Sequence, residues 1–294
     1  MIYFHADDYG ITKKQDEIIL DCAKNGALNS ISVLPNSKHL DDALEVLKAY
    51  DPENKIRRVL HLNFVEGYPC ADPKDIPLLV GKNGKFNKSF IDIWKWNLLF
   101  QGEKRIELKE QFKTEIKAQF TAVTGDNNFK ITAIDSHQHY HMIPVVFDAM
   151  MEVILEDYKH QIKQVRVPVD PLSPLFTTPT VWKDFKGINF VKYMILKPFA
   201  KRNEVILERC GFNVPLFFGI FFTCEMKKKV VTKLLSKYEK IAKRKNINLE
   251  LMFHPGNLEE VEDLLEPTAK DLEEFYFSDN RRAEAECLKT IQKL

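Results

Sequence analysis

Residues 135–142 read Asp-Ser-His-Gln-His-Tyr-His-Met, so three of the eight histidines of the chain lie within five positions of one another. The largely apolar run Ile131–Ile134 comes directly before them, as at the end of a buried strand. If the segment is extended, its three histidines share the face of Asp135, because side chains alternate along a strand. Imidazoles at a strand end can bind a metal ion. The segment therefore predicts a metal or catalytic site, with a histidine-rich surface loop as the simpler alternative.

On both sides of this segment, short apolar runs alternate with helical patterns. Strands are expected at 2–6, 28–34, 58–64, 130–134, 164–167, 217–222 and 247–253. Helices are expected at 12–25, 40–49, 90–100, 106–123, 144–155, 204–210, 227–244 and 281–294. The proline-rich start of 170–199 leaves that stretch unassigned. The alternation predicts an α/β fold with a mostly parallel sheet or barrel.

Chemically capable residues follow several of these strands. Asp7 and Asp8 end the first strand, His61 lies near the end of the third, and His254 directly follows the last. Arg166 lies on the strand at 164–167 and is expected either to bind substrate or to pair with a surface carboxylate. Because sites in α/β folds collect at the carboxyl ends of strands, these residues are expected to meet. For each one alone the alternatives are a solvated turn, a core histidine or a surface pair.

The composition excludes several classes of protein. The net charge of +1 gives no broad basic field, so no nucleic-acid partner is expected. Five cysteines without CxxC spacing argue against a disulfide framework or a zinc ribbon. No apolar run reaches 18 residues and no signal-peptide pattern opens the chain, so we expect a cytoplasmic protein without a membrane partner. A single domain over 1–294 is expected, with a loop and helical insertion around 68–125, and a homodimer is left open.

Four blocks of the sequence resemble one family. They are His5-Ala-Asp-Asp-Tyr-Gly10, His61-Leu-Asn-Phe-Val-Glu-Gly67, Asp135-Ser-His-Gln-His-Tyr-His-Met142 and Met252-Phe-His-Pro-Gly256. In this order they resemble the YdjC-like carbohydrate deacetylases, of which chito-oligosaccharide deacetylase is a type. The resemblance implies a (β/α) barrel-like fold related to polysaccharide deacetylases and one divalent metal ion. It implies that Asp8, His61 and His137 hold the metal and that Asp7 is the base.

Deacetylation of an N-acetylated sugar fits these residues. A metal with two imidazoles and a carboxylate leaves positions for water and the acetyl oxygen, and His254 can protonate the leaving amine. His139 and His141, with Arg166, are expected to hold the substrate or the surrounding shell. The resemblance implies magnesium, whereas imidazole ligands favour zinc or cobalt. The alternatives are a metal-dependent hydrolase of another amide or ester, and an inactive sugar-binding protein.

Overall fold

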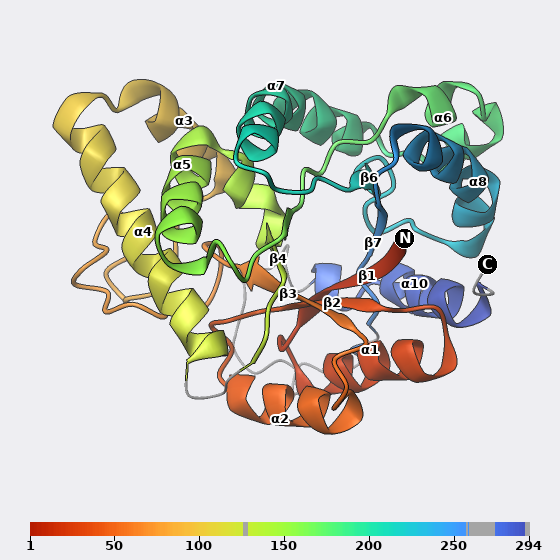
Figure 1. Ribbon diagram of the computed structural model, residues 1–294, viewed down its shortest axis with the longest axis horizontal. Coiled ribbons are helices and arrows are strands. Elements are labelled where there is room, and N and C mark those ends of the chain that lie inside the picture. Colours follow the sequence, from red (N-terminus) through yellow and green to blue (C-terminus); the bar gives the residue numbers. More distant parts are fainter. Residues whose placement is uncertain (126–128, 257, 259–273, 292–294) are drawn as a thin grey trace.

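The computed structural model describes residues 1–125, 129–256, 258 and 274–291, and its centre is one parallel sheet (Figure 1). Seven strands pair in the order β5-β4-β3-β2-β1-β7-β6, and every pairing is parallel. Their bounds are β1 Ile2–Tyr9, β2 Ser30–Val33, β3 Arg57–Leu62, β4 Ala133–Ser136, β5 Gln164–Val165, β6 Leu216–Phe218 and β7 Leu249–Phe253. All carboxyl ends of these strands therefore lie at one edge of the sheet.

The sheet curls far enough that β5, one outer strand, contacts the segment just before β6, the other outer strand. An isolated parallel bridge joins Gln164 of β5 to Asn213, three residues before β6. The Asn213 N–H donates to the Lys163 carbonyl at 2.9 Å. Otherwise neighbours in the sheet are neighbours in the chain, apart from β7, which pairs with β1. This arrangement is a nearly closed barrel, and it confirms the α/β barrel-like fold expected from the sequence.

Helices surround the sheet and fill most of the connections between strands (Figure 1). The α-helices are α1 Lys13–Asn25, α2 Leu40–Tyr50, α3 Phe90–Leu99, α4 Gly102–Thr124, α5 Pro144–Val153, α6 Leu172–Phe176, α7 Gly187–Arg209, α8 Lys228–Lys245 and α10 Asp279–Thr290. Two 3-10 segments, η1 His137–Met142 and η3 Pro179–Asp184, and one π turn, η2 Ile154–Tyr158, complete the described elements. None of the described helices is both long enough and apolar enough to cross a bilayer.

Local sequence explains where several helices begin. The Thr12 side chain accepts the Gln15 N–H and caps α1, as the sequence predicted. Ser89 and Asp92 form a capping box at the start of α3. Pro144 occupies the first turn of α5, where its missing N–H costs nothing.

Two expectations about secondary structure were wrong. Residues 137–142 are not extended, because Gln138 and His139 adopt left-handed conformations, with φ of 50° and 63°. The three histidines therefore do not share one face as they would on a strand. The apolar run 217–222 leaves the sheet after Phe218, since Gly219 has a φ of 157° and the chain turns there. The unassigned stretch 170–199 forms α6, η3 and the first half of α7.

Candidate active site

Two adjacent carboxylates, Asp7 and Asp8, lie near the end of β1, and both are buried. On a regular strand Asp7 and Asp8 would point to opposite faces. The register between β1 and β2 shifts between Ala6 and Tyr9, and Asp8 has a left-handed φ of 69°. This irregularity breaks the alternation at Asp8, so both side chains contact site residues from neighbouring strands. Backbone strain at a strand end is a common feature of functional sites.

Asp8 meets one histidine from β3 and one that directly follows β4. Its Oδ1 lies 3.3 Å from His61 Nε2 and 3.0 Å from His137 Nδ1. The second nitrogen of His61 lies 2.7 Å from Asp135 Oδ1, and His137 Nε2 lies 3.3 Å from Glu66 Oε1. The structure thus brings together the three residues that the resemblance named as metal ligands.

The donor atoms of this cluster fit a metal ion. Among the described residues, Asp8 Oδ2, His61 Nε2 and His137 Nε2 are buried and make no hydrogen bond, because the carboxylate oxygens 3.3 Å from the two Nε2 atoms do not have hydrogen-bonding geometry. One ligand atom from each of the three residues lies within 4.8 Å of the others. A buried polar atom without a partner is costly, and a bound cation would remove that cost. Asp135 would hold the His61 ring in place by its outer nitrogen, as carboxylates do at histidine metal sites.

Negative neighbours shift the pKa of both histidines upward. Burial alone would lower these values, but Asp135 and Asp8 raise the pKa of His61 to about 10. Burial likewise opposes the shift at His137, and Asp8 and Glu66 raise its pKa to about 9. The site therefore favours positive charge between its carboxylates, whether as protons or as a metal ion.

A second cluster of His5, Asp7 and Asp135 also has metal-like spacing, but a guanidinium already fills it. Arg166 donates to both Asp7 oxygens at 2.8 Å and lies 2.7 Å from Asp135 Oδ2. Its Nε donates to Glu250 Oε1. Burial would raise the pKa of Asp7, but Arg166 and His5 hold it well below its usual range. Arg166 is itself buried and does not line the cavity described below, so it contacts Asp7 from behind the site.

The other two histidines of η1 have separate surroundings. His141 is buried, with Nδ1 2.6 Å from Ser136 Oγ and Nε2 2.9 Å from the Arg166 carbonyl. The first contact joins η1 to the end of β4, and the second joins it to the chain after β5. His139 lines the cavity beside Gln138, with its ring edge toward Phe217. Burial first, and then the nearby Arg166 charge, keep the pKa of His139 well below its usual range, so its ring is neutral.

His254 follows β7 and faces Asp7 across the site. Its Nε2 lies 3.7 Å from Asp7 Oδ2, and its Nδ1 lies 3.8 Å from Glu284 Oε2. Its backbone N–H donates to the Glu284 carboxylate, which fixes the turn after the strand. The pKa of the His254 imidazole is not the ordinary histidine value of 6.5. Burial lowers the pKa to about 4, although Asp7 and Asp8 oppose that shift.

One cavity of about 520 Å³ opens onto these groups. Asp7, Asp8, His61, His137 and His254 form its polar part. The facing wall is mostly apolar and comes largely from α3 and α7, with Lys192 of α7 also in the lining. Its apolar residues are Phe90, Ile91, Ile188, Val191, Ile195 and Leu196. A cavity of this size, with convergent polar groups on one side, is typical of a small-molecule site.

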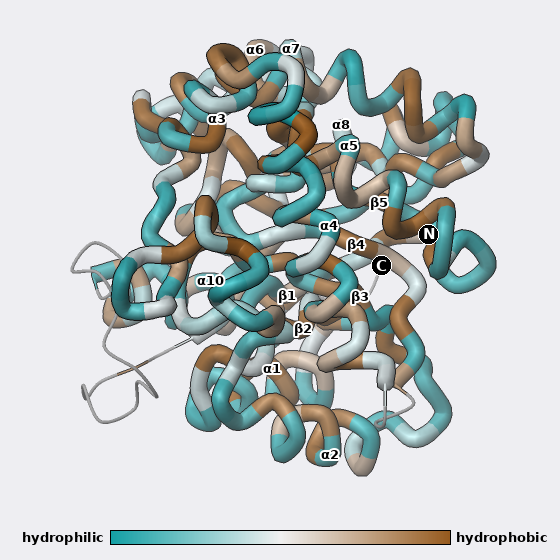
Figure 2. Tube along the Cα trace, turned by 90° about the vertical axis from the view of Figure 1, so that its left-hand side faces the viewer, coloured by the Kyte–Doolittle hydropathy of each residue, from teal (hydrophilic) through white to brown (hydrophobic). Residues whose placement is uncertain are grey.

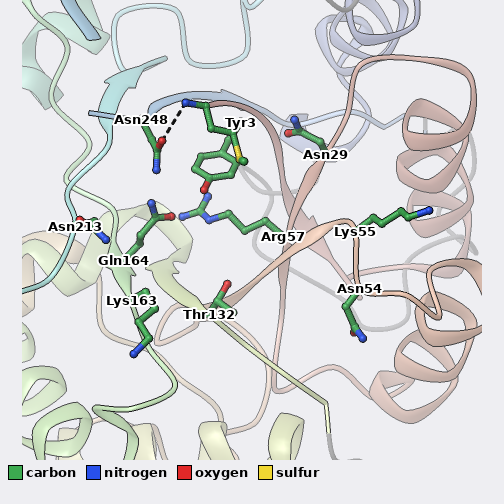
Figure 3. Close-up of a pocket in the computed structure, with 11 residues that line it drawn as sticks. Tyr3, Asn29, Asn54, Lys55, Arg57, Thr132, Lys163, Gln164, Asn213 and Asn248 are labelled. Carbon is green, nitrogen blue, oxygen red and sulfur yellow. Dashed lines mark hydrogen bonds between the residues drawn. The ribbon is translucent and has the colours of Figure 1, made fainter. Parts of the chain in front are cut away.

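A second pocket lies at the opposite end of the strands (Figure 3). There the guanidinium of Arg57 stacks on the Tyr3 ring, and the amino terminus donates to Asn248 Oδ1 at 3.1 Å. Its described lining holds no imidazole and no carboxylate side chain. Groups at this end of a barrel usually stabilise the fold, so we do not assign a reaction to this pocket.

Sequence reasoning missed three polar contributors beneath the site. His5 lies inside β1, with Nε2 3.0 Å from Asp7 Oδ1. Glu250 lies inside β7 and pairs with Arg166, and Glu284 of α10 holds the backbone of His254. A carboxylate such as Glu250 within an apolar strand is a usable signal, because a buried charge requires a partner.

Together, the fold and its cavity define an α/β barrel-like protein whose buried Asp/His/His cluster has the composition and spacing of a metal-ion site. The chain belongs to the YdjC-like protein family, whose family model matches residues 1–292.

Named relatives of this chain include several deacetylases. A carbohydrate deacetylase of Thermoanaerobacter pseudethanolicus is 31% identical over 169 residues, which are 56% of this chain and 60% of that protein. A carbohydrate deacetylase of Xenopus laevis is 26% identical over 265 residues, covering 85% of this chain and 79% of the relative. A chitooligosaccharide deacetylase of Yersinia pestis is 29% identical over 147 residues, which are 50% of this chain and 53% of that protein. The match thus spans only about half to four fifths of these relatives.

A solved structure from Enterococcus faecalis V583, described as a cellobiose-phosphate cleavage protein, has the same fold. The two structures superpose with a TM-score of 0.68 at 17% sequence identity, and the match covers 98% of this chain and 90% of the other chain.

Proposed function

We propose that this protein is a metal-dependent hydrolase that removes the acetyl group from N-acetylated sugars, such as chito-oligosaccharides. The observation that carries the proposal is the buried Asp8–His61–His137 cluster on the floor of the cavity, beside Asp7. The names of the relatives support the substrate class.

In this proposal Asp8, His61 and His137 hold one divalent metal ion. When bound, the ion polarises the acetyl carbonyl and makes a water molecule more acidic. The two imidazoles favour zinc or cobalt over magnesium by ligand softness, although the resemblance to the family implies magnesium. Adding each metal alone to the metal-free protein tests this choice, and activity with magnesium alone contradicts the softness argument.

Asp7 acts as the general base, and Arg166 positions it. The two 2.8 Å hydrogen bonds fix both carboxylate oxygens and keep the group ionised before the reaction. We therefore assign Arg166 to the orientation of Asp7. A direct contact between Arg166 and the substrate was one of the two roles considered from the sequence. His141 likewise supports η1, whereas His139, which lines the cavity, is the histidine of this pair that we assign to the substrate.

His254 protonates the leaving amine, but it begins the reaction neutral because its pKa is about 4. Its Nε2 lies only 3.7 Å from Asp7 Oδ2, so the proton taken up by Asp7 can pass to His254 and then to the amine nitrogen. The same proton that leaves the water thus reaches the leaving group.

The experiment that tests this function measures acetate and free amine from N-acetylglucosamine oligomers, with and without a chelator. We expect equal amounts of both products and loss of turnover on chelation. Turnover of other amides or esters, with none on acetylated sugars, would support the alternative hydrolase. Metal binding without any turnover would support a sugar-binding protein. A cytoplasmic location and a homodimer remain predictions.

A further inference from the structure

Helix α7 exposes apolar side chains on the face opposite its core contacts. Its buried face consists of Asn189, Tyr193, Leu196, Ala200, Asn203 and Leu207. On the outer side, Ile188 is 59% exposed, Phe190 42%, Val191 50% and Met194 52%. We call these four residues the α7 face. A helix that is apolar on its solvent side needs a further partner, because ordinary surface helices are polar there.

The α7 face is continuous with the mouth of the cavity. Ile188 and Val191 line the cavity and are also at least half exposed. Ile91 of α3, across the opening, lines the same cavity and is 40% exposed. Helices α3, α6 and α7 lie at the same end of the molecule in two perpendicular views (Figures 1 and 2). The entrance to the site is therefore rimmed by apolar side chains.

Positive charge accompanies this apolar surface. Residues 171–203 contain six lysines and arginines, at 183, 186, 192, 197, 201 and 202, and a single acid, Asp184. Lys186 pairs with Glu225 and Arg202 with Asp148. Among the described residues, no carboxylate pairs with the exposed Lys192, Lys197 or Lys201. The chain as a whole carries a net charge of only +1, so this excess is local.

We propose that the α7 face is a docking surface for an anionic lipid bilayer. Exposed aromatic and aliphatic side chains flanked by lysines are the features of segments that lie in a membrane interface. A second copy of the chain fits less well, because a symmetric pair across α7 would bring like charges at 192, 197 and 201 together. The absence of a spanning-length apolar run led us to expect no membrane partner. Peripheral binding of this kind does not require such a run.

The test measures binding of the full chain to vesicles by sedimentation. The vesicles contain phosphatidylcholine alone or with a quarter of phosphatidylglycerol. We expect binding to the anionic vesicles that weakens as salt is added. The double variant Phe190→Ser/Met194→Ser should lower the partition coefficient by roughly tenfold or more, since two apolar groups no longer enter the interface. Neither residue lines the cavity, so acetate release from a soluble sugar provides an independent check of folding.

Val46→Ser is the matched control, because Val46 is also 52% exposed but lies on α2, away from α7 (Figure 1). It should bind like the unchanged protein. Lys197→Glu/Lys201→Glu, which leaves the apolar side chains in place, should abolish the preference for anionic vesicles. Failure of the unchanged protein to bind anionic vesicles overturns the proposal, as does equal binding of the double variant and the control. A dimer that the double variant converts to monomer would show that a second copy covers the face.

Discussion

Metal binding should release about two protons from this protein at pH 7.5. In the metal-free protein the pKa of His61 is about 10 and that of His137 about 9, so both rings are protonated at this pH. A metal ion binds only the neutral imidazole, and each ligand must lose its proton first. Below pH 9 the apparent association constant should therefore rise about 100-fold per pH unit, a factor of ten for each proton.

Isothermal titration of the metal-free protein with zinc, in buffers that differ in ionisation enthalpy, counts these protons. His61→Gln is the matched control, because it should reduce the count to about one and the slope to about tenfold per pH unit. Affinity that is independent of pH, without proton release, would refute the assignment of both histidines as protonated ligands.

The raised pKa values of His61 and His137 also determine how the stability of the metal-free protein changes with pH. A histidine whose pKa is raised in the folded state stabilises that state fully at pH values below 6.5, the pKa of a histidine in the unfolded chain. This contribution is lost as the pH rises through the folded-state pKa values of about 9 and about 10. The metal-free protein should therefore have a lower free energy of unfolding at pH 9 than at pH 6.5 from this source. Urea unfolding at the two values, with and without zinc, measures it. The raised pKa values would be contradicted if the free energy of unfolding of the metal-free protein increased from pH 6.5 to pH 9 and that of the His61→Gln/His137→Gln variant did not.

Four substitutions separate the roles at the site. Asp8→Asn should weaken metal binding, whereas Asp7→Asn should retain the metal and lose turnover; metal analysis and acetate assays would reveal reversed roles. Arg166→Met should remove the cation that Asp7 and Asp135 share, whereas Glu250 keeps its pair with Arg57. We expect a cost of about 3–5 kcal/mol, measured by urea unfolding; an unchanged midpoint would show that the pairing is not structural. His254→Ala should keep the metal and lose roughly 10²–10⁴ in rate on an amide. An activated aryl ester should be much less affected, and equal losses on both substrates would exclude leaving-group protonation.

The positions that the sequence could predict depend on local patterns. Apolar runs of strand length located the seven strands, and parallel connections placed their carboxyl ends together. Asp8 and His254 were proposed as site residues because each follows such a run, and His61 because it lies near the end of one. His137 was also identified, although the reason given from geometry, an extended segment, was wrong. It directly follows β4, so its position at the strand end survives the turn that comes after it.

The remaining features depend on contacts between distant segments. Nothing local indicates that Gln138 and His139 adopt left-handed conformations, which are unusual for residues other than glycine. The partners of Arg166 come from β1, β4 and β7, so its burial follows only from the curled arrangement of the sheet. Burial also sets the pKa of His254, which no sequence pattern reports.

The most direct test of the central claim combines metal content with product analysis on one sample. Protein loaded with one equivalent of metal is incubated with N-acetylglucosamine oligomers, and acetate and free amine are measured before and after chelation. We predict that the two products appear in equal amounts, that chelation stops their formation, and that His137→Ala contains no stoichiometric metal and forms neither product. Full metal occupancy in His137→Ala, or acetate release that continues in the chelated protein, would contradict the account.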